Sequence, residues 1–312
     1  MALRQLISVG VRLTVAATFG SAALAAQAPV ATFSSGIDLV RVSAIVRDHK
    51  GRFVENLTAR DFEVLDNGQT RSISDFRRDL SGVSVGLLFD VSGSMESTLP
   101  EAREAATHVL SWLEPGDEAA VFTFDTRLEE VAPFTSGLKT LPASMATVTP
   151  FGATSLHDAI AQMAERLATR EGRRRAVVVF TDGRDTWSKM TPDEVAAIAS
   201  GIDVPVYLFA AVPGIDNPTS EFSTNEEHSS LSGALSELAS RTGGRVVVAS
   251  TPGTRSLAAR QIIAELRHQY LIAFESSGTS GWHPLVVRAR NKDLTVRARN
   301  GYIAGRSRPN LN

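Results

Sequence analysis

Hydrophobic residues follow two different periodicities along the chain. From Ile37 to Phe76, apolar residues alternate with polar ones, as in strands that bury one face. The alternation is clearest at 37–47 and 62–65. The tripeptide Asp66-Asn67-Gly68 favours a hairpin turn because Asn and Gly tolerate positive φ. We expect Ser72 to Phe76 to pair back across that turn, which makes this first part of the chain all β.

Between Val83 and His268, runs of consecutive apolar residues alternate with amphipathic segments. Strands that are apolar on both faces and separated by helices are typical of a mostly parallel sheet with helices on both sides. We therefore predict a doubly wound α/β domain, with Trp112 in its core and an exposed loop at 213–230. Predicted strands are 83–89, 119–124, 176–180, 204–212 and 246–249, and predicted helices are 99–113, 155–167, 192–199, 231–239 and 256–268.

Strand-like alternation returns after Tyr270, with a turn at Asn291-Lys292-Asp293. Neither this segment nor the early one has enough strands to bury a core alone. We expect the two to form one small β-sandwich into which the α/β domain is inserted. The predicted organisation is a signal peptide at 1–26, sandwich parts at 37–80 and 270–306, and the α/β domain at 81–269.

The N-terminus has the pattern of an export signal. Arg4 and Arg12 precede an apolar run from Leu13 that ends in Ala23-Leu24-Ala25, which fits cleavage after Ala25 or Ala26. The alternative is an uncleaved membrane anchor, but the run is shorter than the roughly 20 apolar residues of a spanning helix. We expect an exported protein, periplasmic, cell-surface or secreted, with no stable membrane span after signal removal.

Composition limits the available chemistry. The 312 residues contain no cysteine, which excludes disulfides, thiolate nucleophiles and zinc sites of the cysteine type. The 32 Lys and Arg against 34 Asp and Glu give a formal net charge of −2, so no global field favours a nucleic acid. The six histidines are scattered and show no His-Glu-x-x-His motif. Oxygen-bearing side chains are left as the main candidates.

Such oxygen-bearing side chains follow the ends of the predicted strands. Asp90, Ser92 and Ser94 come directly after the first α/β strand, Asp182 follows another, and Thr154 precedes a helix. Ligands of open α/β sheets bind outside the carboxyl ends of the strands, so these groups are expected at one edge. Each element alone also fits a helix N-cap or a turn. Together they favour a site for a hard cation such as Mg²⁺ or Mn²⁺.

The pattern Asp90-x-Ser92-x-Ser94 with Thr154 and Asp182 resembles the metal-ion-dependent adhesion site of von Willebrand factor type A domains. The resemblance covers the predicted α/β domain, and the flanking β segments look like those of bacterial exported proteins of the VWFA-related type. It implies a Mg²⁺ (or Mn²⁺) bound directly by Ser92, Ser94 and Thr154, with Asp90 and Asp182 acting largely through waters. An ion that contacts mainly neutral hydroxyls stays electrophilic and can accept a carboxylate from a partner protein.

We therefore expect a divalent-cation-dependent protein-binding module, for adhesion or complex assembly, without catalysis of its own. Its ligand would be a protein that presents an Asp or Glu. Phe151, Arg184, Asp185 and Trp187 neighbour the same edge and are candidate partner-binding residues, although Asp185 fits a turn cap equally well.

Two alternatives remain open. One is a metal-dependent hydrolase or phosphatase at the same edge, but the sequence offers no clear nucleophile or general base. Ser92 and Ser94 lie outside any Gly-x-Ser-x-Gly elbow. The other is a structural domain whose metal site is idle.

Overall fold

The computed structural model describes residues 39–78, 82–170, 172–210, 233–249 and 251–304. The predicted signal peptide at 1–26 and the predicted loop at 213–230 lie outside these ranges. Among the described residues, no helix combines the length and the apolar character needed to cross a membrane.

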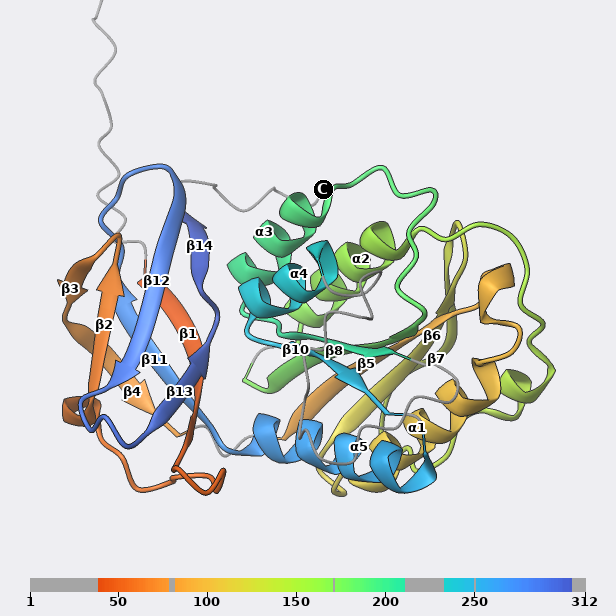
Figure 1. Ribbon diagram of the computed structural model, residues 1–312, viewed down its shortest axis with the longest axis horizontal. Coiled ribbons are helices and arrows are strands. Elements are labelled where there is room, and N and C mark those ends of the chain that lie inside the picture. The colour runs from red at the N-terminus through yellow and green to blue at the C-terminus, as the bar shows by residue number, and fades with distance from the viewer. Residues whose placement is uncertain (1–38, 79–81, 171, 211–232, 250, 305–312) are drawn as a thin grey trace, which may run out of the picture. The chain divides into compact units, whose positions relative to one another are not determined.

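A six-stranded sheet forms the centre of the α/β region, in the order β10-β9-β8-β5-β6-β7 (Figure 1). The five strands from β10 to β6 run parallel, and β7 pairs antiparallel with β6. All residues of β5 are buried, as expected for a central strand with helices on both faces. The strands are β5 (Val83–Asp90), β6 (Glu118–Phe124), β7 (Leu128–Ser136), β8 (Arg174–Thr181), β9 (Val206–Ala210) and β10 (Arg245–Val248).

Helices cover both faces of this sheet, which confirms the predicted doubly wound α/β fold. Helices α1 (Leu99–Ser111) and α5 (Pro252–Arg267) pack on one face. Helices α2 (Leu156–Ala168), α3 (Pro192–Ile202) and α4 (Ala234–Thr242) pack on the other (Figure 1). Short 3-10 turns are η1 (Ala59–Asp61), η2 (Gly93–Met95) and η3 (Ala143–Thr147). Gly86 lets α2 approach β5 closely, because a Cβ there would collide with the Met163 side chain.

Two four-stranded antiparallel sheets enclose a second core, as predicted for the β-sandwich. Their orders are β13-β1-β11-β4 and β14-β12-β2-β3, so each sheet combines two strands from the early part of the chain with two from the late part. Phe62 and Tyr270 meet edge to face in the core, with ring centroids 5.4 Å apart. The strands are β1 (Leu39–Arg47), β2 (Phe62–Asp66), β3 (Gln69–Arg71), β4 (Ile73–Arg77), β11 (Gln269–Glu275), β12 (Gly281–Ala289), β13 (Thr295–Ala298) and β14 (Gly301–Ala304).

The hairpin after β2 differs from the prediction. Asn67 and Gly68 form the expected turn, with φ of 51° and 76°. The strand that pairs back is β3, in the register Asp66↔Gln69, so the prediction that residues 72–76 form this partner was wrong. These residues mostly belong to β4, which crosses to the other sheet and pairs with β11. The crossing brings the Phe76 ring against Phe62 in the core between the sheets.

Trp112 does not lie in the core, contrary to the prediction. It is the residue at which α1 ends, and 41% of it is exposed. The guanidinium of Arg260 from α5 lies 5.3 Å from its ring centroid. The amphipathic pattern of residues 99–113 places Trp112 on the apolar face of a helix. Helix α1 ends at Ser111, so Trp112 does not continue that face.

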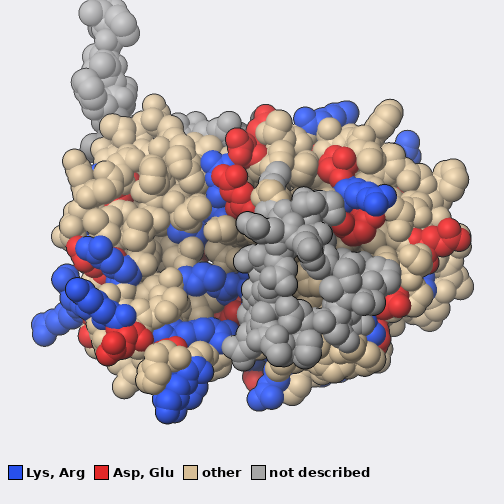
Figure 2. All heavy atoms as spheres, in the orientation of Figure 1, with Lys and Arg blue, Asp and Glu red and all other residues tan. Residues whose placement is uncertain are grey.

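Basic side chains gather over the two four-stranded sheets on the face seen in Figure 2. Among the arginines of the sandwich, Arg52, Arg77 and Arg288 lie 2.7, 2.8 and 2.9 Å from the carboxylates of Asp48, Asp75 and Glu63. Arginines paired in this way offer little free charge to an anionic ligand.

A buried ion cluster connects α5 with strands of both sheet systems. Glu265 of α5 is 2% exposed. One of its carboxylate oxygens lies 3.1 Å from both Arg47 of β1 and Arg245 of β10, and the other pairs with Arg297 of β13. The cluster fixes the end of α5, which a single residue separates from the start of β11.

Candidate metal centre

Strand β5 ends at the buried carboxylate of Asp90. The Ser92 amide donates to Oδ1 at 2.9 Å. The Thr181 hydroxyl, at the end of the adjacent strand β8, donates to Oδ2 at 2.7 Å. Both oxygens of Asp90 are thereby fixed in orientation by neutral donors from two neighbouring strand ends.

The two serines after β5 bring their hydroxyls together. In the turn that begins η2, the Oγ atoms of Ser92 and Ser94 lie 3.2 Å apart. Ser92 is buried and Ser94 is exposed. The two hydroxyls therefore extend from the buried surroundings of Asp90 to the solvent-exposed surface.

The loop that carries Thr154 is bonded to the loop that carries the serines. The Gly93 amide donates to the Gly152 carbonyl at 3.1 Å, and the Phe151 amide donates to the Val91 carbonyl at 2.8 Å. These bonds bring the chain before α2 to the same edge as Ser92 and Ser94, as the sequence predicts for Thr154.

Thr154 is also bonded to the loop that follows β8. Its amide donates to Thr186 Oγ1 at 2.9 Å, and its carbonyl accepts from the amides of Thr186 and Trp187 at 3.0 and 2.9 Å. The residue is buried. Three loops of the carboxyl edge are thus connected through backbone hydrogen bonds.

Asp182 follows β8 directly and is partly buried. Its Oδ1 accepts from the Arg184 amide at 3.1 Å, and its Oδ2 lies 3.7 Å from the exposed Arg184 Nε. It lies near enough to Asp90 for its negative charge to act on that carboxyl. The two predicted acidic residues therefore share one site.

Burial raises the pKa of Asp90 to about 6, and the nearby Asp182 carboxylate adds to the rise. Hydrogen bonds from Ser92 and Thr181 act in the opposite direction. In the part of the chain that the structure describes, no Lys, Arg or His forms an ion pair with Asp90. The site thus holds a buried acid without a protein cation to neutralise it.

The predicted partner-binding residues separate into two groups. Phe151 and Trp187 are 82% and 64% exposed, and Arg184 is exposed as well. The Asp185 carboxylate is turned to the protein: it accepts from the amides of His157 and Ser188 and from the Ser188 hydroxyl. Burial acts to raise the pKa of Asp185, but these bonds and the His157 ring hold it below its ordinary value. Asp185 therefore has the capping role, at the first turn of α2.

Thr181 and Thr186 belong to the site but were not singled out from the sequence. Thr181 could have been considered from its place immediately before Asp182 at the end of a predicted strand, but its bond to Asp90 depends on β8 lying next to β5. The bond from Thr154 to Thr186 depends on a contact between two loops, for which the sequence carries no signal.

The donors at this edge fit a hard divalent cation. Among the described residues, no group of three or more acidic or histidine side chains could hold a metal ion on its own. The candidate site combines two carboxylates with the hydroxyls of Ser92, Ser94 and Thr154, and such oxygen donors suit Mg²⁺ or Mn²⁺.

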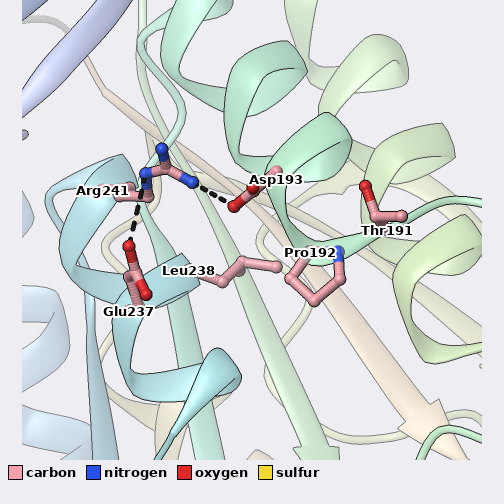
Figure 3. Close-up of a pocket in the computed structure, with 6 residues that line it drawn as sticks. All are labelled: Thr191, Pro192, Asp193, Glu237, Leu238 and Arg241. Carbon is pink, nitrogen blue, oxygen red and sulfur yellow. Dashed lines mark hydrogen bonds and ion pairs between the residues drawn. The ribbon is translucent and has the colours of Figure 1, made fainter.

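A separate pocket of about 210 Å³ lies between α3 and α4 (Figure 3). Its Arg241 points to Asp193 and Glu237, and the Arg241 Nε atom is 3.8 Å from the Glu237 carboxylate. With this cation already paired to two carboxylates, the pocket offers no evident chemistry for a ligand. It is lined by Thr191, Pro192, Asp193, Glu237, Leu238 and Arg241.

Comparison with known proteins identifies the region around the site. Residues 85–184 match the family model of the von Willebrand factor type A domain. This range contains all five predicted metal ligands. No curated protein sequence matches the chain.

Solved structures similar to this chain share little sequence with it. An aerotolerance-related membrane protein from Bacteroides fragilis is 20% identical, with a TM-score of 0.47 over 59% of this chain and 99% of that one. The protein BatB from Bacteroides thetaiotaomicron is 19% identical, with a TM-score of 0.46 over 59% and 98%. A von Willebrand factor type A protein from Catenulispora acidiphila is 16% identical, with a TM-score of 0.46 over 87% and 75%.

Proposed function

Because the chain carries a von Willebrand factor type A domain, we propose that it is a divalent-cation-dependent protein-binding module that acts through a metal-ion-dependent adhesion site. Domains of this family serve protein interaction. The finer proposal concerns the ion, its ligands and the group that the ion binds.

The observation that carries the proposal is the buried Asp90 carboxylate beside two converging hydroxyls. Burying an unpaired charge is costly, and proteins normally place a cation next to it. Here the neighbours are the Ser92 amide, the Thr181 hydroxyl and a second acid, Asp182. A bound Mg²⁺ or Mn²⁺ would supply the missing positive charge.

In this proposal, Ser92, Ser94 and Thr154 bind the ion directly, and Asp90 and Asp182 act largely through waters. Neutral hydroxyls leave most of the ion's charge available to another ligand. A carboxylate from an Asp or Glu of a partner protein would complete the coordination. The chain's own residues hold and orient the ion, and we propose no catalytic step.

We further propose that the protein acts after export, at the cell surface, in the periplasm or in the secreted state. The apolar N-terminal run after Arg4 and Arg12 supports this location. N-terminal sequencing of the mature protein tests it, with a new N-terminus after Ala25 or Ala26 as the expected result.

The metal site is tested by isothermal titration of Mg²⁺ and Mn²⁺ into the chelator-treated full-length chain. Wild type is expected to show saturable binding at one site, and Ser94→Ala and Asp182→Asn to lose it. Ser97→Ala is the matched control, because Ser97 is an exposed serine just beyond η2 and is not part of the motif. A folded wild type that binds no ion, or equal binding by Ser94→Ala, would contradict the proposal.

A further inference from the structure

Two aromatic side chains at the rim of the candidate site are left in water. Phe151 is 82% exposed and Trp187 is 64% exposed. Other large apolar side chains that the structure describes as exposed, such as Leu257 at 51% and Trp112 at 41%, are better covered. Exposed aromatic side chains on the loops that carry a candidate site are typical of an interaction surface.

Backbone hydrogen bonds hold both aromatic residues in place. The Phe151 amide donates to Val91, next to Ser92, and the Trp187 amide donates to Thr154. Neither residue therefore sits on a free loop tip. Aromatic side chains on a fixed backbone lose little conformational entropy when a partner covers them, which makes them effective anchors.

The same bonds attach the two aromatics to different ligand loops. Phe151 belongs to the loop of Thr154 and is hydrogen-bonded to the loop of Ser92, whereas Trp187 belongs to the loop of Asp182 and is hydrogen-bonded to Thr154. A carboxylate that reaches the ion between these loops arrives beside an aromatic residue on each of them. A small carboxylic acid would leave both rings in water, whereas a protein segment could cover them.

The two charged side chains of the rim, those of Arg184 and Asp185, already have partners within the protein. Arg184 is exposed, and its Nε lies 3.7 Å from Asp182 Oδ2, so its guanidinium stands at the solvent side of the site. Asp185 contributes nothing to this surface, because its carboxylate is used by His157 and Ser188.

We propose that the partner is a protein segment in which an Asp or Glu is directly flanked by bulky apolar residues. The carboxylate binds the ion, and the apolar side chains pack on Phe151 and Trp187. This inference rests on the proposed metal-dependent function, and it adds the chemical class of sequence that the site selects.

The test is a selection from a random peptide library displayed on phage, against the full-length chain in Mg²⁺ and in EDTA. Wild type in Mg²⁺ is expected to enrich peptides with an acidic residue next to Leu, Ile, Phe, Trp or Met. The double variant Phe151→Ser/Trp187→Ser is expected to keep the acidic preference and lose the apolar one. Trp112→Ser, an exposed tryptophan at the far end of α1, should select as wild type does.

A selected peptide is then titrated against each variant. Its dissociation constant is expected to rise about tenfold or more for Phe151→Ser or Trp187→Ser, and binding should be lost in Ser94→Ala. Mn²⁺ affinity of the two aromatic variants should equal that of wild type, which shows that they fold and keep the ion.

The outcomes separate this inference from the proposed function. A wild type that binds no Mn²⁺ overturns the metal site and this inference with it. A wild type that binds Mn²⁺ but enriches no sequence, or acidic peptides without apolar neighbours, overturns the inference alone. Apolar peptides retained in EDTA would make the aromatics an independent surface, and Mg²⁺-driven self-association that needs Phe151 and Trp187 would make a second copy the partner. Either result also overturns it.

Discussion

Asp90 and Glu265 are both buried acids of the α/β region, yet their surroundings are opposite. Glu265 contacts three arginines, Arg47, Arg245 and Arg297. Asp90 accepts hydrogen bonds from an amide and a hydroxyl, and the nearby charge that acts on it is that of another acid, Asp182. The first carboxylate is paired with cations within the protein, whereas the second has no ion-pair partner among the described residues and would, in the proposed function, be neutralised by a bound cation.

The comparison shows how burial alone fails to distinguish a structural acid from a functional one. Asp66 in the sandwich follows the Glu265 pattern: it pairs with His283 Nδ1 at 2.8 Å and with Arg71 Nε at 3.1 Å. Removing a buried acid that is surrounded by cations destabilises the fold, because those cations lose their counterion. A buried acid surrounded by hydroxyls is a candidate binding site.

Of the variants that test this contrast, Glu265→Gln should change the free energy of unfolding most. Glu265→Gln keeps the shape but leaves three arginines facing a neutral amide, and should lower the free energy of unfolding by about 3–5 kcal/mol. Urea denaturation measures the loss. Glu114→Gln is the control: Glu114 also pairs with an arginine, at 2.9 Å, but is 68% exposed, so a change below about 1 kcal/mol is expected. Equal losses in the two variants would refute the distinction.

Asp66→Asn should have the next largest effect. It removes the counterion of Arg71 and the carboxylate partner of His283 within the sandwich. A loss of about 1–3 kcal/mol is expected, measured by the same denaturation. The control is Asp75→Asn, whose side chain is 42% exposed. If Asp66→Asn is as stable as wild type, the negative charge of Asp66 does not contribute to the stability of the sandwich.

Asp90→Asn should stabilise the metal-free protein, whereas Glu265→Gln and Asp66→Asn should destabilise it. The pKa of Asp90 rises from 3.8 to about 6 on folding, so folding favours the protonated form. Its contribution to stability is therefore greatest below pH 3.8 and is lost as the pH rises through about 6. In EDTA, the variant should equal wild type below pH 3.8 and be more stable by up to about 3 kcal/mol at neutral pH.

Addition of Mg²⁺ sharpens the same measurement. The ion should stabilise wild type and leave the stability of Asp90→Asn unchanged. The difference in unfolding free energy between the two proteins should therefore become smaller. A variant less stable than wild type in EDTA at neutral pH would mean that the charge of Asp90 is already compensated within the protein.

Ser94→Ala should have the smallest effect on the fold. Ser94 is exposed, and its hydroxyl lies 3.2 Å from that of Ser92. The unfolding free energy in EDTA should change by less than about 0.5 kcal/mol. The rise in melting temperature on adding Mg²⁺ should nevertheless disappear, as thermal denaturation with and without the ion would show. A retained rise would remove Ser94 from the site.

The sequence predicted the central strands because burial on both faces leaves continuous apolar runs. Strand β7 was missed, since an edge strand carries polar residues such as Glu129 and Glu130 and includes Pro133. Strand β14 was missed as well: its four residues include Gly301 and do not form a run of β-branched residues like that of β10. The partner of β2 was misassigned because the sequence does not indicate that β4 leaves the hairpin for the other sheet.

The two acidic candidate ligands could be predicted from the same continuous apolar runs. Asp90 and Asp182 directly follow apolar strands, and parallel strands bring their carboxyl ends to one edge. The bond from Thr181 to Asp90 required knowing that β8 lies next to β5. The capping role of Asp185 required knowing how its loop meets α2, and the exposure of Phe151 and Trp187 required the packed structure.

Strands β4 and β11 are hydrogen-bonded neighbours, with Arg77 opposite Leu271. The chain leaves the sandwich at β4 and returns at β11, so the whole α/β region occupies the position of a hairpin loop. Such an arrangement allows one genetic insertion to install a complete binding module without altering the strand order of its host. Truncations for expression should likewise replace the inserted region by a short turn, since a cut at either end would divide the sandwich.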